Sequence, residues 1–251
     1  MGISQKKVAL ITGASSPSDI GAAICRKLAT QGVDIFFTNW KSESGWSENF
    51  KKEIIGLGVQ CESIEIDLSD ANAAYNVLDA VSSKFGSPSI LVNNAAYSTS
   101  GGYMELDAQT LDDHYVVNMR STFLLCVEFA RRFEKSNLQS GRIINLTSGQ
   151  DLGPMPAELA YVATKGAISA FTRSLSTELA PIGITVNAVN PGPTDSTWMT
   201  DEIREYLLPK FKMGRIGKPE DAARMIAFLA SDEAEWITGQ IIHSEGGFNR
   251  G

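Results

Sequence analysis

A tyrosine and a lysine, Tyr161 and Lys165, stand four positions apart just ahead of an apolar helical stripe. Residues at i and i+4 lie on one face of a helix, about one turn apart, so we expect these side chains to be neighbours. A phenol has a pKa of about 10, and a nearby ammonium group favours its ionised form. The pair can therefore form an acid–base centre in which Lys165 lowers the pKa of Tyr161, although the same spacing also suits an ordinary amphipathic helix.

A serine-rich turn follows the first apolar run of the chain. Residues 8–12 are mostly apolar, Gly13 and Gly21 bracket the turn, and a helical stripe begins at Ile20. A turn of this kind aims backbone N–H groups and the positive end of a helix at a phosphate group. Gly13 permits the tight bend and Gly21 a close approach. A pyrophosphate site is one interpretation, and an ordinary βα loop is the other.

Seven short β-branched runs alternate with longer helical patterns and must position these residues. The runs cover residues 8–12, 34–38, 62–66, 90–92, 142–146, 184–189 and 240–243. Strands joined by helices are parallel, and their ligands bind beyond the carboxyl ends of the strands. We expect an α/β fold, a Rossmann-type doubly wound parallel sheet of about seven strands with helices on both faces. Residues 1–251 should form a single dinucleotide-binding and catalytic domain, with a small substrate lobe around residues 193–215.

The composition excludes several classes of protein. The chain has 251 residues, of which 43% are apolar, and its 29 acids and 22 bases give a net charge of −7. A chain of this length buries a core without cross-links, and its negative field repels nucleic acids and anionic membranes. Its three separated cysteines and two distant histidines form neither a disulfide framework nor a zinc cluster. No secretory or membrane-spanning run is present, so we expect a cytoplasmic protein with no metal, nucleic-acid or membrane partner.

Further motifs agree, in order and spacing, with one known family. Residues 93–96 read Asn-Asn-Ala-Ala, Asn118 and Ser148 follow, the Tyr161–Lys165 pair gives a YxxxK motif, and residues 190–192 read Asn-Pro-Gly. This set resembles the short-chain dehydrogenase/reductase family across nearly the whole chain, and residues 214–222 and 242–247 are most similar to 3-oxoacyl-(acyl carrier protein) reductases.

The resemblance implies the roles of four catalytic residues, Asn118, Ser148, Tyr161 and Lys165. Tyr161 would donate a proton to a carbonyl oxygen as hydride arrives from a nicotinamide, and Ser148 would hydrogen-bond the same oxygen. Asn118 would hold a water against Lys165 and complete a proton relay. Read one at a time, these residues also suit structural positions, and we expect His114 and His243 to be structural.

The resemblance also implies a set of cofactor-binding residues. They are Gly13, Ser15, Ser16, Ile20, Gly21, Asn39, Lys41, Asp67, Leu68, Asn94, Ala95, Tyr161, Lys165, Thr194 and Ser196. Asn39 stands where NAD-selective members carry an aspartate that rejects a 2′-phosphate. Lys41 and nearby serine hydroxyls can supply charge and donors, so we expect NADPH as the cofactor, with NADH as the alternative.

The turn itself departs from the family pattern. It is two residues longer, and Asp19 stands where the middle glycine would fall. A carboxylate facing a diphosphate would be repelled. We therefore expect Asp19 to cap the helix that begins at Ile20, the alternative being a loop that takes a different path round the cofactor.

The expected function is NADPH-dependent reduction of a carbonyl, a 3-oxoacyl group or similar ketone, to an alcohol. The alternatives are an NAD-dependent alcohol dehydrogenase of the same family and a non-catalytic nucleotide-sensing protein. An acyl or aryl ketone suits the apolar residues expected in the substrate cleft, which are Tyr97, Leu152, Pro154, Met155, Trp198, Met199 and Tyr206. The partner is thus a small-molecule substrate, with an acyl thioester among the candidates, although Gln139 and Ile182 lack the positive charge that carrier-protein docking uses. The resemblance implies a homotetramer.

Overall fold

One parallel sheet forms the centre of the molecule in the computed structural model, which describes residues 6–250. Its strands are β1 (Val8–Ile11), β2 (Asp34–Asn39), β3 (Cys61–Glu65), β4 (Ile90–Asn93), β5 (Gly141–Leu146), β6 (Ile184–Asn190) and β7 (Ile241–His243). They pair in the order β3-β2-β1-β4-β5-β6-β7. The predicted doubly wound fold is confirmed, and each strand lies within a residue or two of the predicted run.

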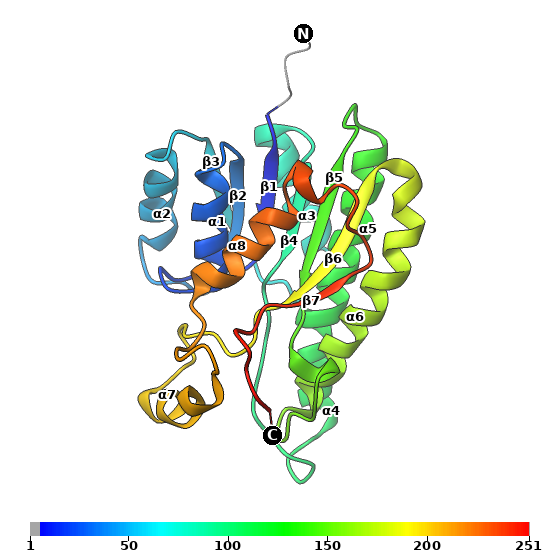
Figure 1. Cartoon of the computed structure of the whole chain (residues 1–251). Helices are drawn as coiled ribbons and strands as arrows, with labels where there is room; N and C mark the ends of the chain where they lie inside the picture. The colour runs from blue at the N-terminus through cyan, green and yellow to red at the C-terminus, as the bar shows by residue number, and fades with distance from the viewer. Residues whose placement is uncertain (1–5, 251) are drawn as a thin grey trace.

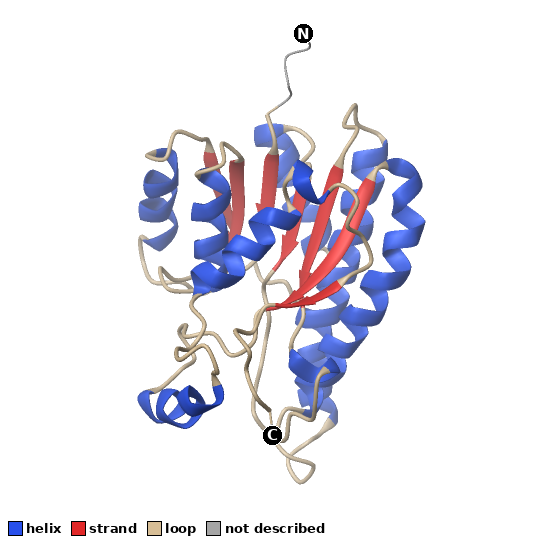
Figure 2. Cartoon of the chain, in the orientation of Figure 1, coloured by secondary structure: helices blue, strands red, loops and turns tan. Residues whose placement is uncertain are grey.

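Two layers of helices cover the sheet (Figures 1 and 2). The long helices are α1 (Ile20–Ala29), α2 (Trp46–Ile55), α3 (Ala73–Phe85), α5 (Ser121–Glu134), α6 (Leu159–Leu179) and α8 (Pro219–Leu229). Strand side chains alternate between the layers: Ala9 and Ile11 of β1 pack with α1, α2 and α8, whereas Val8 and Leu10 pack with α3, α5 and α6. Because both faces are covered, the strands are almost continuously apolar.

Shorter elements complete the chain. They are α4 (Ala108–His114), α7 (Asp201–Leu207), the π-helical segment η1 (Tyr115–Arg120) and the 3₁₀ turns η2 (Gly149–Asp151), η3 (Ala180–Ile182), η4 (Leu208–Lys210) and η5 (Asp232–Ala234). Helix α7 stands apart from the two layers, beyond the carboxyl ends of the strands (Figure 1). Among the described residues, no helix has both the length and the apolar content needed to cross a membrane.

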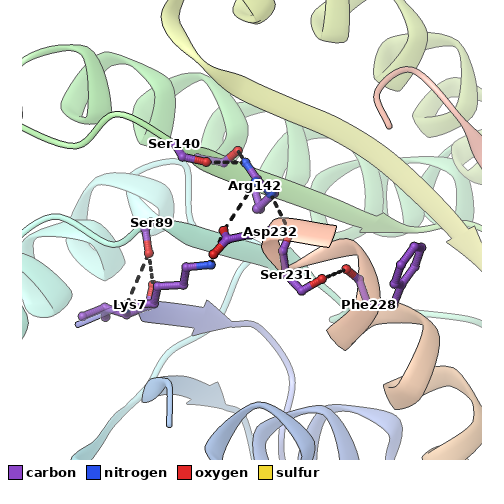
Figure 3. Close-up of polar contacts among 9 residues, drawn as sticks. Lys7, Ser89, Ser140, Arg142, Phe228, Ser231 and Asp232 are labelled. Carbon is purple, nitrogen blue, oxygen red and sulfur yellow. Dashed lines mark hydrogen bonds and ion pairs between the residues drawn. The ribbon is translucent and has the colours of Figure 1, made fainter. Parts of the chain in front are cut away.

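A polar network connects η5 to the amino-terminal ends of the strands, at the end of the sheet opposite α7 (Figure 3). Arg142 of β5 is 4% exposed and donates to Ser140 Oγ at 2.6 Å and to the carbonyl oxygen of Ser231 at 3.3 Å. Lys7, next to β1, reaches Asp232 Oδ1 at 2.6 Å. Burial lowers the pKa of Arg142. The network lies away from the candidate site, and we expect it to stabilise the fold.

The topology fixes where a ligand can bind. The chain runs outward from β1 through β2 to β3, then returns to β4 and runs outward the other way. The loops after β1 and β4 therefore diverge and leave a crevice between them at the carboxyl ends of the strands.

Candidate active site at the carboxyl ends of the strands

The turn after β1 packs tightly against the loop after β4. Gly13 has φ +76°, a conformation that favours glycine, and a Cβ there would lie 2.8 Å from Ala95 Cα. Asn94 donates from Nδ2 to the carbonyl oxygens of Thr12 at 2.9 Å and Gly13 at 2.8 Å. A Cβ at Gly21 would overlap the Gly13 carbonyl. The close approach that Gly21 permits is therefore the approach of α1 to the turn and to Asn94.

Asp19 caps α1, so the predicted capping role is confirmed. Its Oδ1 accepts from the backbone N–H of Ala22 at 2.6 Å, and its Oδ2 accepts from Ser15 at 2.7 Å and Ser16 at 2.9 Å. Burial raises the pKa of the Asp19 carboxyl, and these three hydrogen bonds oppose that shift. The two additional residues of the turn are therefore folded around the carboxylate. One consequence is that the N–H groups of Ser15 and Ser16 are already engaged within the protein.

A cleft of about 620 Å³ opens at this crevice. Ten of the expected cofactor residues line it: Gly13, Ser15, Ile20, Asn39, Lys41, Asp67, Leu68, Asn94, Ala95 and Ser196. Sequence reasoning did not assign cofactor contacts to the remaining lining residues, Asp19, Thr38, Trp40, Ile66, Ser69, Ala96, Tyr97, Asp113, Val116, Val117 and Thr197. Several of these residues directly follow β2, β3 or β4. Their sequence positions just after predicted strands could therefore have identified them as cleft residues.

Some expected residues lie outside this lining. Ser16 faces Ser18, with 3.4 Å between the two hydroxyl oxygens. Thr194 is 3% exposed and donates to the carbonyl oxygen of Gly192 at 3.1 Å. Met199, expected in the substrate cleft, is only 4% exposed and does not line this cleft. The other expected cofactor residues outside the lining are Gly21, Tyr161 and Lys165.

The end of β2 holds an amide in place of an acid. Asn39 is 2% exposed and donates from Nδ2 to Ser42 Oγ at 2.9 Å, while its Oδ1 has no hydrogen-bond partner in the described part of the chain. Lys41 is exposed and has φ +48°. Its backbone N–H donates to Glu65 Oε1 at 3.2 Å. Glu65, at the end of neighbouring β3, is an acid beside this part of the cleft that sequence reasoning missed.

Ser148, Tyr161 and Lys165 come together beyond the end of β5. Desolvation raises the pKa of Tyr161 to about 12, while a hydrogen bond with Ser148 lowers it. Lys165 is buried, donates from Nζ to the carbonyl oxygen of Leu146 at 2.8 Å and lies 5.4 Å from the centre of the Tyr161 ring. Its own pKa is lowered by burial to about 8. Desolvation is thus the largest influence on the Tyr161 pKa and acts against the lowering expected from Lys165.

Asn118 lies in the π-helical segment η1 and is fully buried. Its Oδ1 accepts from the N–H of Tyr97 at 2.7 Å, and its Nδ2 donates to the Tyr97 carbonyl at 2.8 Å and to Thr164 Oγ1 at 3.2 Å. The residue therefore ties the cleft wall at Tyr97 to α6, one position before Lys165. A π-helical turn of this kind is common at functional sites. The role of Asn118 in holding a water stays a prediction.

The two histidines have the hydrogen bonds of structural residues. His114 is fully buried, with Nδ1 2.8 Å from the Thr110 carbonyl and Nε2 accepting from the N–H of Thr99 at 3.2 Å. His243 Nδ1 lies 3.0 Å from Asn190 Nδ2. Across residues 6–250, no three histidine, cysteine or acidic side chains gather as a metal site would require.

Comparisons with known proteins agree with this geometry. The family model described as enoyl-(acyl carrier protein) reductase matches residues 13–249. A short-chain dehydrogenase/reductase from Serratia marcescens BCRC 10948 superposes with a TM-score of 0.89, at 35% identity over 97% of this chain and 98% of its own. The chain belongs to the short-chain dehydrogenase/reductase family, whose members are oxidoreductases that act on C=O and CH–OH groups of small molecules with a nicotinamide cofactor.

Two relatives show which members of the family this chain is similar to. The 3-oxoacyl-[acyl-carrier-protein] reductase FabG of Staphylococcus aureus (strain Mu50 / ATCC 700699) is 37% identical over 246 residues, which are 96% of this chain and 97% of the relative. The uncharacterized oxidoreductase YjdA of Bacillus subtilis (strain 168) is 74% identical over 251 residues, the full length of both chains. Within the family the chain is thus similar to 3-oxoacyl reductases.

Proposed function

We propose that this protein is an NADPH-dependent carbonyl reductase that converts a 3-oxoacyl group or a similar ketone to an alcohol. The observation that carries the proposal is that Asn118 joins the wall of the cleft to the helix that bears Tyr161 and Lys165. Its amide links Tyr97, in the wall of the nucleotide-sized cleft, to Thr164 on the helix that bears Tyr161 and Lys165. Asn118 thereby connects the helix of Tyr161, whose pKa Ser148 lowers, to a cleft of about 620 Å³.

The residues of the cleft fit a nicotinamide dinucleotide. Gly13 leaves the turn without a side chain, and the amide of Asn39 has an oxygen free of partners in residues 6–250, where a ribose hydroxyl or a solvent molecule can donate. We assign the adenosine half to Asn39, Lys41, Asp67 and Leu68, and the nicotinamide half to Ser196, with Thr194 in support. The N–H of Ile20 and the start of α1 complete the site at the phosphates.

The proposed chemistry uses the protein's own groups for every proton. When bound, the nicotinamide cofactor supplies the hydride. Tyr161, with a pKa of about 12, keeps its proton at neutral pH and can donate it to the carbonyl oxygen. The Ser148 hydroxyl hydrogen-bonds the same oxygen and stabilises its developing charge. Lys165, held by the Leu146 carbonyl, stands behind the Tyr161 ring and favours the phenolate that remains.

One observation favours an alternative function, an NAD-dependent alcohol dehydrogenase. The Glu65 carboxylate, 3.2 Å from the backbone nitrogen of Lys41, adds negative charge where a 2′-phosphate would lie. Lys41 opposes it with a flexible positive charge. By contrast, Asp19 folds the longer turn, so the altered glycine pattern no longer favours a non-catalytic nucleotide-sensing protein.

We also propose a substrate lobe, a location in the cell and an oligomeric state for the protein. Residues 193–215 would be the lobe that covers the substrate, with the exposed rings of Trp198 and Tyr206 facing an acyl or aryl group. A cytoplasmic homotetramer is proposed by resemblance to the family. Light scattering on the purified protein tests the tetramer.

The decisive experiment measures oxidation of NADPH and NADH with a panel of 3-oxoacyl thioesters and simple ketones, and reduction of NADP and NAD with cyclic alcohols. We expect the highest kcat/KM with NADPH and a 3-oxoacyl thioester or related ketone. Turnover only with NAD and alcohols would establish the alternative. Binding of both cofactors with no turnover of any panel member would overturn both.

A further inference from the structure

Residues 244–250, here called the strap, follow β7 and run beyond the carboxyl ends of the strands (Figure 1). They contain a partly buried ion pair that the proposed chemistry does not use. Arg250 Nη1 donates to Glu245 Oε2 at 2.7 Å, and Arg250 Nη2 donates to Glu245 Oε1. The side chains are 19% and 7% exposed, respectively. A two-pronged pair of this kind is geometrically specific, and loss of one partner leaves the other charge buried.

The first loop that the strap holds is the one after β6. Asn190 is fully buried and donates from Nδ2 to Glu245 Oε1 at 2.7 Å, while its carbonyl accepts from the N–H of Ser244 at 2.8 Å. Gly192 lies so close that a Cβ there would meet the Glu245 Cβ at 3.0 Å. The carboxylate of Glu245 is therefore fixed to the start of the loop that leads into the lobe.

The second contact is with the lobe itself. Phe248 pairs with Phe211 as an antiparallel bridge, and their ring centres are 5.0 Å apart. The N–H of Asn249 donates to the Lys210 carbonyl at 2.9 Å. The guanidinium of Arg250 lies 5.2 Å from the centre of the Phe248 ring. The strap thus fastens the far end of the lobe, at residues 210–213, to the ion pair.

The third contact is with the loop that follows the catalytic serine. Gly149 is buried, and a Cβ there would overlap the Arg250 guanidinium, coming within 2.8 Å of Cζ. A Cβ at Gly153 would lie 3.2 Å from Arg250 Cδ. The Arg250 side chain therefore fills the space over residues 149–153 and lies against the backbone of the residue next to Ser148.

We propose that Arg250, locked to Glu245, is a positioning residue that holds the Ser148 loop and the substrate lobe in one arrangement and so sets carbonyl turnover without contributing to nucleotide binding. The inference rests on the proposed carbonyl-reductase function. None of the strap residues lines the nucleotide cleft. The strap acts on the reacting oxygen only through the Ser148 hydroxyl and on the substrate only through the lobe.

The kinetic test compares Arg250→Ala, Arg250→Lys and the parent protein, with Arg224→Ala as the matched control. Arg224 also forms an ion pair, with Asp221 at 2.7 Å, but its side chain is 65% exposed. We expect Arg250→Ala to lower kcat/KM for the best panel ketone at least about 30-fold, because a misplaced catalytic group costs turnover, and to change the Kd for NADPH less than about threefold. Arg250→Lys should recover part of the loss, and Arg224→Ala should behave as the parent.

A double-mutant cycle separates positioning from loosening of the whole fold. Because Arg250 is proposed to act on the reacting oxygen through Ser148 and on the substrate through the lobe, Arg250→Ala should cost at least about threefold less in kcat/KM when Ser148 is already alanine than in the parent background. A cost as large as in the parent background would overturn the proposal. So would an NADPH Kd that rises in step with the loss of turnover.

Amide hydrogen exchange tests the strap independently of activity. In Arg250→Ala, residues 149–153 and 208–213 should exchange at least about tenfold faster, while residues 13–25 exchange as in the parent. Unchanged exchange in both segments would overturn the proposal, as would a uniform increase. If the parent reduces no carbonyl, the proposed function fails, and hydrogen exchange still decides whether Arg250 holds the two segments together.

Discussion

Replacement of Gly21 by alanine tests the packing of the nucleotide turn. A Cβ at Gly21 would overlap the Gly13 carbonyl and lie 2.8 Å from the Gly13 carbonyl carbon and 2.9 Å from Asn94 Nδ2. Ordinary contact begins at 3.4 Å. The start of α1 must therefore move by more than about half an ångström. The Gly13 backbone cannot relieve the clash by a change of rotamer, as a side chain could.

Two opposing effects set the size of the loss. Overpacking of this kind costs about 1–3 kcal/mol or more, whereas alanine favours a helix over glycine by about 1 kcal/mol. Because the clash is with backbone, we expect the upper part of that range and a net loss of about 2 kcal/mol. With a slope of about 2–3 kcal/mol per molar urea, the unfolding midpoint should fall by about 0.7–1 M. Displacement of α1 should also weaken NADPH binding at least about tenfold, or 1.4 kcal/mol.

The assay is urea unfolding followed by tryptophan fluorescence, together with NADPH titration. Gly56→Ala is the matched control, because Gly56 has φ −60° and a Cβ there meets nothing closer than 3.2 Å. Gly56→Ala should leave the midpoint and the NADPH Kd close to those of the parent. An unfolding midpoint and NADPH Kd for Gly21→Ala that match those of the control would refute the tight packing of α1 on the turn.

Three further predictions concern the cofactor, pH and the far end of the sheet. Asn39→Asp should shift the ratio of kcat/KM for NADPH and NADH at least about tenfold toward NADH, since a carboxylate repels a 2′-phosphate; an unchanged ratio would contradict the assignment of β2. Lys165 carries its charge below a pKa of about 8, whereas Tyr161 keeps its proton to about 12, so reductive kcat/KM should fall above about pH 8 and Lys165→Arg should remove that fall. Persistence of the fall in the arginine variant would exclude Lys165 as its source. Arg142→Ala should destabilise the fold by about 1–3 kcal/mol in urea unfolding, since the Ser231 carbonyl loses its buried donor, with the NADPH Kd unchanged; equal stability would show that the network of Figure 3 contributes nothing.

Much of the fold follows from the sequence, because apolar periodicity and strand–helix alternation determine a parallel sheet. The β3 strand was predicted one residue late, since Cys61 is buried in the sheet although the β-branched run begins after it. The capping role of Asp19 was also predictable, because a short acid just before a helix is a strong capping signal. By contrast, the π-helical turn that places Asn118 has no signature in a single sequence.

The parts of the site that escaped prediction depend on contacts between distant segments. Glu65 meets Lys41 only because β2 and β3 pair in register, and Trp46 donates to the Ala14 carbonyl at 3.0 Å from another helix. Arg250 reaches the Ser148 loop across about a hundred positions of sequence. Burial is another effect that spacing does not show: the spacing predicts that Lys165 lowers the pKa of Tyr161, and desolvation acts in the opposite direction and raises that pKa.

Tyr161 is the proposed proton donor in carbonyl reduction, on which the whole mechanism depends. The most direct measurement compares Tyr161→Phe with the parent in NADPH oxidation with the best panel ketone, alongside NADPH binding by fluorescence. We expect kcat to fall by at least about a thousandfold, because general acid catalysis is lost, while the NADPH Kd changes less than about threefold. A Tyr161→Phe variant with the kcat of the parent would contradict the mechanism.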